Sequence, residues 1–278
     1  MVYKIKKLII LIILHTFLMS VALSCIFPLL WMVNVSFQKN SEFKQTFGLS
    51  IPEKITFDNY IRIFKETKIT MHFLNSVFYT FVTVLSIVFI SSLAGYAFSR
   101  LEFKGKNFLF YLFLAAMMIP LPAGFVPVYV LLTKLKLVNR LGYILAMSNM
   151  GLSLSIYLLK TFFDQLPRDL EDAAKIDGCS KLGIWWHVAL PLVKPALGVV
   201  VIFNSLNVWN EFVLASLMFT EESLMPLQVG LMEIYNKNVI DYTLVMSGLT
   251  LACLPIILIY LRMQKYIIKG ITSGALVG

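Results

Sequence analysis

Charged residues are scarce in this sequence. Asp, Glu, Lys and Arg make up 14% of its 278 residues, whereas hydrophobic residues make up 59%. A soluble domain carries roughly 25% charged residues, so this chain has too few charges to cover a water-facing surface of its size. Together with a mean hydropathy of +0.81, the scarcity of charge excludes an ordinary soluble enzyme and indicates a surface that faces lipid.

The sequence also lacks the patterns of metal centres, disulfide frameworks and nucleotide-binding enzymes. Its three cysteines show no pairing or metal-ligand spacing, and no Ser/His/Asp constellation is visible, so we predict no metal site and no catalytic residue. A Gly-x-x-x-x-Gly-Lys-Ser/Thr phosphate loop is missing, because its nearest fragment, residues 105–107, lacks the preceding glycine and the hydroxyl. We therefore expect this chain to bind no cofactor and to hydrolyse no ATP itself.

The net charge of +9 is the one feature that would fit a nucleic-acid partner. The cations, however, gather at the ends of apolar runs, where they meet anionic headgroups and fix the orientation of spans. Clusters of this kind lie at the N-terminus, after the second apolar run and near the C-terminus (Lys4, Lys6, Lys7; Arg100, Lys104, Lys106; Arg262, Lys265, Lys269). We therefore expect membrane lipid and no nucleic acid as a partner, with both termini in the cytoplasm.

Six apolar stretches are long enough to cross a membrane, which takes about 20 residues. They are residues 8–31, 73–98, 107–132, 141–163, 192–217 and 242–261. The first stretch follows three lysines as a signal peptide would, but it exceeds the roughly 7–15 apolar residues of a signal core, so we interpret it as an uncleaved span. The predicted fold is an all-α integral membrane protein of the cell membrane with six transmembrane helices.

The predicted organisation has three parts. Residues 1–72 hold the first helix and an external loop, residues 73–264 hold a core of five helices, and residues 265–278 form a cytoplasmic tail. The third span contains Pro120, Pro122, Gly124 and Pro127, and each proline inside a helix removes a backbone donor and kinks or breaks it. Such a helix either lines a pathway or packs its kink against neighbouring helices, and the sequence leaves both interpretations open.

The cytoplasmic segment of residues 164–191 is long for a connection between spans and has the signals of a folded loop. Pro167 suits a helix start, the acids that follow it complement the helix dipole, and Gly178 suits a left-handed helix end. Ser180 is placed to cap a second short helix. In the first helix Leu170, Ala173 and Ala174 share a face, which is apolar and nearly flat. We expect this face to dock a cytoplasmic protein, with a helix resting on the headgroups as the alternative.

The same segment resembles the EAA loop of ABC importer permeases. Residues 172–178 read Asp-Ala-Ala-Lys-Ile-Asp-Gly, and after nine further residues the chain reads Val188-Ala189-Leu190-Pro191. The family form is Glu-Ala-Ala, three residues, Gly, nine residues, Ile, one residue, Leu-Pro. The spacing matches throughout, and Asp172 and Val188 are conservative departures from Glu and Ile.

Further stretches are similar to the carbohydrate-uptake group of that family, on the side of its MalG-type subunit. They are Phe57-Asp58-Asn59-Tyr60, Asn75-Ser76, the run from Gly95 to Arg100, Trp209-Asn210-Glu211-Phe212, and an ending from Gln264 to Ala275. The resemblance covers essentially the whole chain. It implies the permease subunit of a binding-protein-dependent importer for a sugar or oligosaccharide, although some members of the group carry glycerol phosphate instead.

The resemblance also implies partners and coupling residues. It implies a second permease subunit of the MalF type, two ATPase subunits that bind ATP and Mg²⁺, and an external sugar-binding protein that the loop of about residues 218–241 faces. The EAA loop would dock on an ATPase subunit through Leu170, Asp172, Ala173, Ala174, Gly178, Leu190 and Pro191.

Candidate pathway residues lie in the fifth span. Asn204, Asn207 and Glu211 are spaced to form one stripe on a helix, and Trp209 and Asn210 lie beside it. Polar groups at bilayer depth usually face a cavity or a partner, so we expect either a substrate pathway or hydrogen bonding between helices. Glu211 also admits a different interpretation, as the proton or cation site of a secondary transporter.

Overall fold

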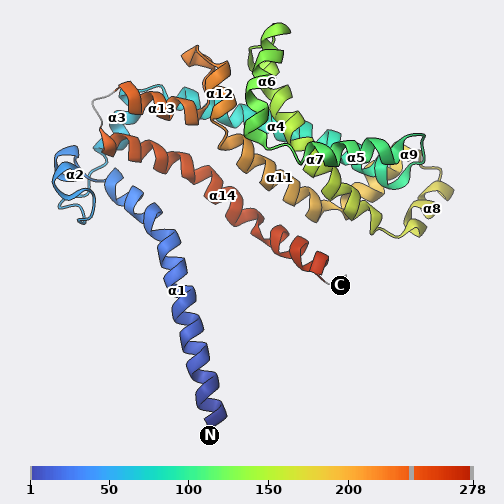
Figure 1. Ribbon diagram of the computed structural model, residues 1–278, viewed down its shortest axis with the longest axis horizontal. Coiled ribbons are helices and arrows are strands. Elements are labelled where there is room, and N and C mark those ends of the chain that lie inside the picture. The colour runs from blue at the N-terminus through green and yellow to red at the C-terminus, as the bar shows by residue number, and fades with distance from the viewer. Residues whose placement is uncertain (1, 238–240, 276–278) are drawn as a thin grey trace. The chain divides into compact units, whose positions relative to one another are not determined.

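The computed structural model describes residues 2–237 and 241–275, and within these ranges it consists of helices, turns and loops without a strand. The N-terminal helices are α1 (Val2–Ser36), α2 (Asn40–Thr46) and α3 (Asp58–Glu66). The following helices are α4 (Ile69–Arg100), α5 (Lys106–Ala116), α6 (Leu121–Lys134) and α7 (Arg140–Asp164). Figure 1 shows these helices along the chain.

Short helices follow α7. They are α8 (Arg168–Ile176), α9 (Lys181–Ile184), the π-helical turn η1 (Trp185–Ala189) and α10 (Leu190–Leu192). The chain continues through α11 (Lys194–Trp209), α12 (Val213–Met218), the 3₁₀ turn η2 (Glu222–Leu224), α13 (Leu227–Lys237) and α14 (Tyr242–Ala275). The predicted tail is helical as far as Ala275, and its last residues, 276–278, lie outside the described residues.

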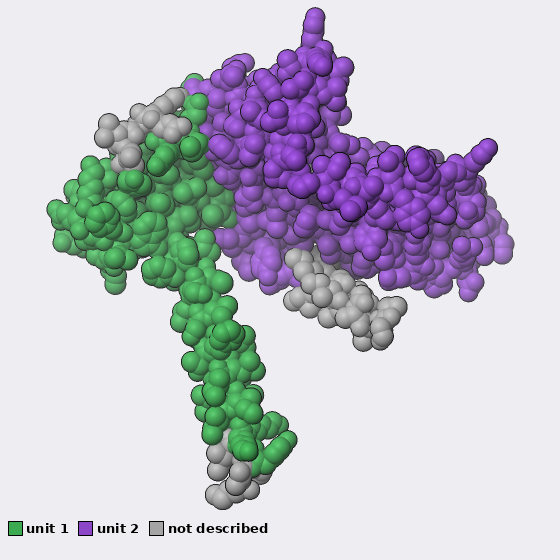
Figure 2. Space-filling model, viewed as in Figure 1, with its two compact units in different colours: residues 1–69, 231–254 green, residues 70–230, 255–278 purple. Residues whose placement is uncertain are grey.

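The chain forms two compact units, coloured separately in Figure 2. Unit 1 comprises Met1–Ile69 and Leu231–Leu254, and unit 2 comprises Thr70–Gly230 and Pro255–Gly278. The first boundary lies close to the one predicted after residue 72. The sequence did not predict that Leu231–Leu254 would pack with the N-terminal part, because nothing local to that segment indicates its distant neighbours.

Four helices are long and apolar enough to cross a membrane: Lys6–Ser36, Ile69–Arg100, Arg140–Asp164 and Tyr242–Gln264. A fifth crossing is available only as a bent pair, Lys181–Leu192 with Lys194–Trp209, whose axes differ by 80°. The all-helical membrane fold is therefore confirmed, whereas the prediction of six transmembrane helices is not confirmed by the four or five candidate spans of the described residues. The third and the fifth predicted spans are each divided between two shorter helices.

The third predicted span breaks between α5 and α6, at the prolines. Pro120 has an extended ψ of 127° and precedes the first residue of α6, and Pro122 lies in the first turn. Prolines at the start of α6 cost nothing, since their missing N–H groups would have no helical partner. The same missing groups prevent α5 from continuing through these residues as one helix. The fifth predicted span ends at Trp209 and resumes at Val213.

Unit 2 has two apolar clusters at different levels of α4 and α7. One contains the packed rings of Tyr79, Tyr143 and Phe219, with centroids 5.0 to 5.5 Å apart. The other surrounds Tyr96, Phe163 and Trp185 and includes the buried side chain of Ala174. The second cluster fixes the position of the α8–α10 segment.

Candidate functional site

The segment from Gln165 to Leu192 folds as the turn signals predict. Ser180 accepts a hydrogen bond from the backbone N–H of Gly183 (3.1 Å) and so caps α9. Gly178 has φ +81°, and the N–H groups of Gly178 and Cys179 donate to the carbonyls of Lys175 (3.0 Å) and Ala174 (2.9 Å). This pair of bonds is the Schellman motif, which confirms the predicted left-handed end of α8. Pro167 lies one position before the helix.

A buried ion pair anchors α8 to the end of α4. Arg100 Nε lies 2.7 Å from Glu171 Oε1, and the two side chains are only 7% and 10% exposed. Tyr96 donates its hydroxyl to the other carboxylate oxygen of Glu171 (3.4 Å), and Arg100 also donates to the carbonyl of Leu166 (2.6 Å). From the sequence alone, Glu171 is only one of the acids expected to complement the helix dipole, because no spacing rule relates it to a residue 71 positions earlier.

A second pair of contacts fixes the segment just before α8. Ser99 donates its hydroxyl to Asp164 Oδ1 (2.6 Å), and Lys160 Nζ contacts Asp164 Oδ2 (2.6 Å). Tyr96, Ser99 and Arg100 all come from the run Gly95–Arg100 that carries part of the family resemblance. In this structure the polar members of that run hold the α7–α8 connection.

The exposed face of α8 differs from the predicted one. Leu170 is 44% exposed and Ile176 is 87% exposed, and Ala173 lies between them on the same side. Ala174, predicted to share this face, is 7% exposed and packs inward with Tyr96 and Trp185. Helical spacing identifies residues that share a stripe but not which part of the stripe faces the core. Here the buried ion pair of Glu171 with Arg100 turns the side of α8 that carries Ala174 toward the core.

The remaining predicted loop residues are on or near the surface. Asp172 is exposed and pairs with Lys175 (2.7 Å), whose hydrogen bond lowers the pKa of Asp172 below its ordinary value. Pro191 is exposed and Leu190 is half-buried, both in α10. Leu170, Asp172, Ala173 and Gly178 thus lie on the outer side of the segment, whereas Ala174 does not.

Asn204 connects α11 to α7. It is 3% exposed and donates to Ser155 Oγ (3.0 Å) and to the carbonyl of Val200 (2.8 Å). The helices approach closely there, because a Cβ at Gly151 would lie 2.3 Å from Asn204 Oδ1. For Asn204 the structure therefore favours hydrogen bonding between helices.

Two hollows in unit 2 bring the other polar candidates together. One, of about 470 Å³, is lined by Asn204, Asn207, Asn210 and Glu211 together with residues such as Met147 and Pro122. The other, of about 500 Å³, shares Asn204 and Asn207 and is otherwise lined mainly by apolar residues of α5, α6, α7 and the α5–α6 connection, including Pro120 and Gly124. Asn207 and Asn210 are exposed. The broken third span thus lines the same hollows as the asparagines.

Glu211 and Trp209 make contacts that the sequence did not predict. Glu211 lies past the end of α11, where its carboxylate accepts from the N–H groups of Leu214 (2.6 Å) and Ala215 (3.0 Å) and from the hydroxyl of Tyr143 (3.0 Å). It caps the start of α12, which explains the break in the predicted fifth span. Trp209 is 5% exposed and packs edge-on against Phe73 (5.6 Å between centroids), and it lines neither hollow.

The start of α4 holds the loop after α12. Asn75 Nδ2 donates to the carbonyls of Ser223 (2.9 Å) and Met225 (3.0 Å), Ser76 Oγ accepts from the N–H of Leu227 (2.7 Å), and Tyr79 donates to the carbonyl of Leu224 (2.8 Å). The pair Asn75-Ser76 therefore shapes the first part of the predicted external loop. Residues 238–240 of that loop lie outside the described residues.

Residues 87–273 match the family of binding-protein-dependent transport system inner membrane components. The chain belongs to this family. It is 34% identical to the arabinooligosaccharides transport system permease protein AraQ of Bacillus subtilis, covering 94% of each chain, and 33% identical to the trehalose/maltose transport system permease protein MalG of Thermococcus litoralis, covering 92% of this chain and 93% of MalG.

A solved structure agrees with the family assignment. The fold matches a chain of a bacterial ABC transporter involved in the import of the acidic polysaccharide alginate, with a TM-score of 0.83, 25% identity and coverage of 92% of this chain and 95% of that chain. Permeases of this family are not catalytic themselves, and the inner-membrane family and the apolar helices identify this chain as a membrane protein.

Proposed function

We propose that this chain is the permease subunit of an ATP-driven, binding-protein-dependent ABC importer for a sugar or oligosaccharide. The observation that carries the proposal is the α8–α10 segment, which is rigidly anchored by Arg100 and Glu171 and exposes Leu170, Ala173 and Ile176. Because the segment is fixed to α4, a movement of a partner docked on it would be passed to the membrane helices. The partner must also supply the ATPase, because this chain has no phosphate loop of its own. The ATP and Mg²⁺ belong to two separate ATPase subunits in this proposal.

The proposed topology has six crossings with both termini in the cytoplasm. Besides the four long helices, α5 with α6 form the third crossing and α11 with α12 the fifth, each as a broken helix. Irregular backbone at membrane depth is tolerated where it lines a cavity, and both breaks lie beside the hollows that Asn207 lines. ATP binding on the partners would then switch the permease between two conformations that open on opposite sides.

The proposed substrate is neutral and rich in hydroxyl groups. Relatives are named for arabinooligosaccharides, trehalose or maltose, and galactooligosaccharides. Asn207 and Asn210 offer amide donors and acceptors to such a substrate, with Asn204 and Glu211 behind them in the same hollow. Among the described residues that line the two hollows, none is Lys, Arg or His, which favours a sugar over glycerol phosphate. A second permease of the MalF type would complete the pathway.

The first test is to purify the tagged protein from its native membranes and to identify the chains that co-purify with it. The second is to measure uptake of labelled oligosaccharides by proteoliposomes that contain the purified complex, with a matching binding protein added. The proposal predicts a co-purifying ATPase and a second permease, and uptake that requires ATP. Uptake by this chain alone without ATP would replace the proposal with a secondary transporter. The capping role of Glu211 argues against that alternative, since its carboxylate oxygens already accept three hydrogen bonds.

A further inference from the structure

Residues 47–51, here named the strap, fold back along the C-terminal end of α1. Two side chains of α1, Trp31 and Asn34, and the side chain of Gln38 just after the helix hold the backbone of the strap. Trp31 Nε1 donates to the carbonyl of Phe47 (3.3 Å), Asn34 Nδ2 donates to the carbonyls of Gly48 (3.0 Å) and Ser50 (2.9 Å), and Gln38 Nε2 donates to the carbonyl of Ser50 (2.7 Å). The strap is therefore fixed to α1 at the level of Trp31 and Asn34.

Gly48 allows the strap to lie this close to the helix. Its φ is +73°, and a Cβ there would lie 2.4 Å from Val35 Cγ2 and 2.9 Å from Trp31 Nε1. Any other residue would be strained in the left-handed region and would collide with α1. The fold thus positions the strap through a specific close contact and four hydrogen bonds.

The strap exposes its large apolar side chains. Phe47 is 70% exposed, Leu49 is 78% exposed and Ile51 is 85% exposed, whereas Gly48 is buried against α1. Exposed Lys44 and Lys54 flank the strap, and the nearby Glu42 accepts a hydrogen bond from the backbone of Glu53 (3.1 Å). Apolar side chains with flanking cations are typical of segments that lie in a membrane interface.

The position along α1 agrees with such an interface. The apolar run from Leu8 to Trp31 rises about 36 Å at 1.5 Å per residue, slightly more than the roughly 30 Å of a hydrocarbon core. None of the most apolar 18-residue window of α1 is buried within the chain. Trp31, at the end of the run, is of the residue type enriched where hydrocarbon meets headgroups, and the strap lies at its level.

We propose that the strap is a membrane-interface anchor that inserts Phe47, Leu49 and Ile51 into the boundary between headgroups and acyl chains beside the end of α1. The lipid surface continues there from the exposed surface of the spanning helix. This anchor is independent of the transported substrate and of the coupling segment, because the strap and its contacts all lie in unit 1.

The experiment places a nitroxide spin label at Leu49→Cys in a background without the three native cysteines. The matched control is Gln45→Cys, an exposed polar position of α2 just before the strap. The protein is reconstituted with its co-purifying chains in phospholipid vesicles. We then measure how often each label collides with oxygen, which concentrates in lipid, and with a nickel chelate, which stays in water. The measurement is then repeated on this chain alone in the same lipids.

The proposal predicts that the Leu49 label collides several-fold more often with oxygen than with nickel, in both samples, while the Gln45 label favours nickel. A Leu49 label that favours nickel as strongly as the control would overturn the proposal, since the strap would then lie in water. A Leu49 label shielded from both reagents only in the complex would also overturn it, since another subunit and not lipid would then cover the strap.

Discussion

The two ends of α4 hold two different loops by different chemistry. Near its start, Asn75, Ser76 and Tyr79 bond to backbone groups of residues 223–227 through uncharged side chains. At its end, Arg100 and Tyr96 bind the carboxylate of Glu171 in α8. The first loop is held by its backbone whatever its side chains are, whereas the α8 segment is held through one particular side chain.

The difference has an energetic consequence. A neutral hydrogen bond contributes about 1 kcal/mol net to the stability of the fold, and several such bonds hold the loop at the start of α4. Breaking a buried ion pair by removing one partner costs about 3–5 kcal/mol, because the remaining charge is left without compensation. The end of α4 that holds α8 is therefore predicted to be the more fragile of the two.

Arg100→Met should have the largest effect. It leaves the 10%-exposed carboxylate of Glu171 without its cation, so we expect a loss of about 3–5 kcal/mol in stability and of transport. The measurement is thermal unfolding of the detergent-solubilised protein together with uptake in proteoliposomes. The double variant Arg100→Met with Glu171→Met should recover much of the lost stability, and a double variant no better than the single one would contradict a charge-based anchor.

Asn75→Ala should have a smaller effect. It leaves the carbonyls of Ser223 and Met225 without their amide donor, although Arg140 also approaches the carbonyl of Ser223 (3.4 Å). We expect a cost of about 1–3 kcal/mol and a loosened loop, measured as faster amide hydrogen exchange over residues 219–227. Exchange in the α8–α10 segment should stay unchanged, and equal loosening of both segments would show that the two ends of α4 are not independent.

Gly178→Asp should affect coupling more than stability. The left-handed φ costs a non-glycine residue roughly 1–2 kcal/mol, and a Cβ there meets no atom within 4 Å, so the variant should fold and enter the membrane. The added carboxylate lies at the end of the exposed face of α8, where we expect it to reduce co-purification of the ATPase. Gly178→Ala is the matched control with the same backbone strain, and if both variants lose the ATPase equally, strain and not the surface is responsible.

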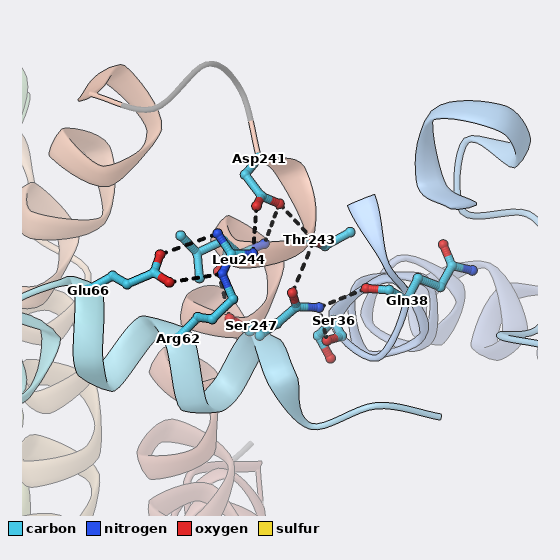
Figure 3. Close-up of polar contacts among 9 residues, drawn as sticks. Ser36, Gln38, Arg62, Glu66, Asp241, Thr243, Leu244 and Ser247 are labelled. Atoms are coloured by element: carbon cyan, nitrogen blue, oxygen red, sulfur yellow. Dashed lines mark hydrogen bonds and ion pairs between the residues drawn. The ribbon is translucent and has the colours of Figure 1, made fainter. Parts of the chain in front are cut away.

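The smallest effect concerns a third anchor, the ion pair of Arg62 with Asp241 in unit 1, whose contacts are drawn in Figure 3. Arg62 lies 2.9 Å from Asp241, which also accepts from Thr243 and from the N–H at the start of α14. Burial raises the pKa of Asp241, but the bonds from Thr243 and Arg62 outweigh it and hold the pKa below the ordinary 3.8.

This carboxylate contributes stability that is complete above about pH 5 and is lost as the pH falls below 3.8 through its folded pKa. Because the Arg62 side chain is 39% exposed, we expect less than about 1 kcal/mol. Asp241→Asn should remove this part of the acid dependence, measured as the melting temperature between pH 3 and pH 6. A steeper acid dependence in the variant would contradict the assignment.

The sequence predicted best what depends on neighbours in the chain. Gly178 and Ser180 follow from local turn and cap chemistry, and the hydropathy of α1, α4, α7 and α14 identifies spans without reference to partners. The pairing of Arg100 with Glu171 joins distant residues, so no local pattern reveals it. The break after Trp209 depends on Glu211, which caps α12. The sequence alone does not distinguish a carboxylate that faces a pathway from one that caps a helix, because both lie in an apolar run.

The most direct test of the central claim, that α8 docks an ATPase through its outer face, compares crosslinking from two adjacent positions. Each variant, Ala173→Cys or Ala174→Cys, is made in the cysteine-free background and purified as the complex with an ATPase that carries a single cysteine on its surface. A short bifunctional maleimide crosslinker is then added to each complex. We expect a crosslink from Ala173, which is exposed, and none from Ala174, which is 7% exposed and packs with Tyr96 and Trp185. Equal crosslinking from both, or crosslinking from Ala174 alone, would contradict it.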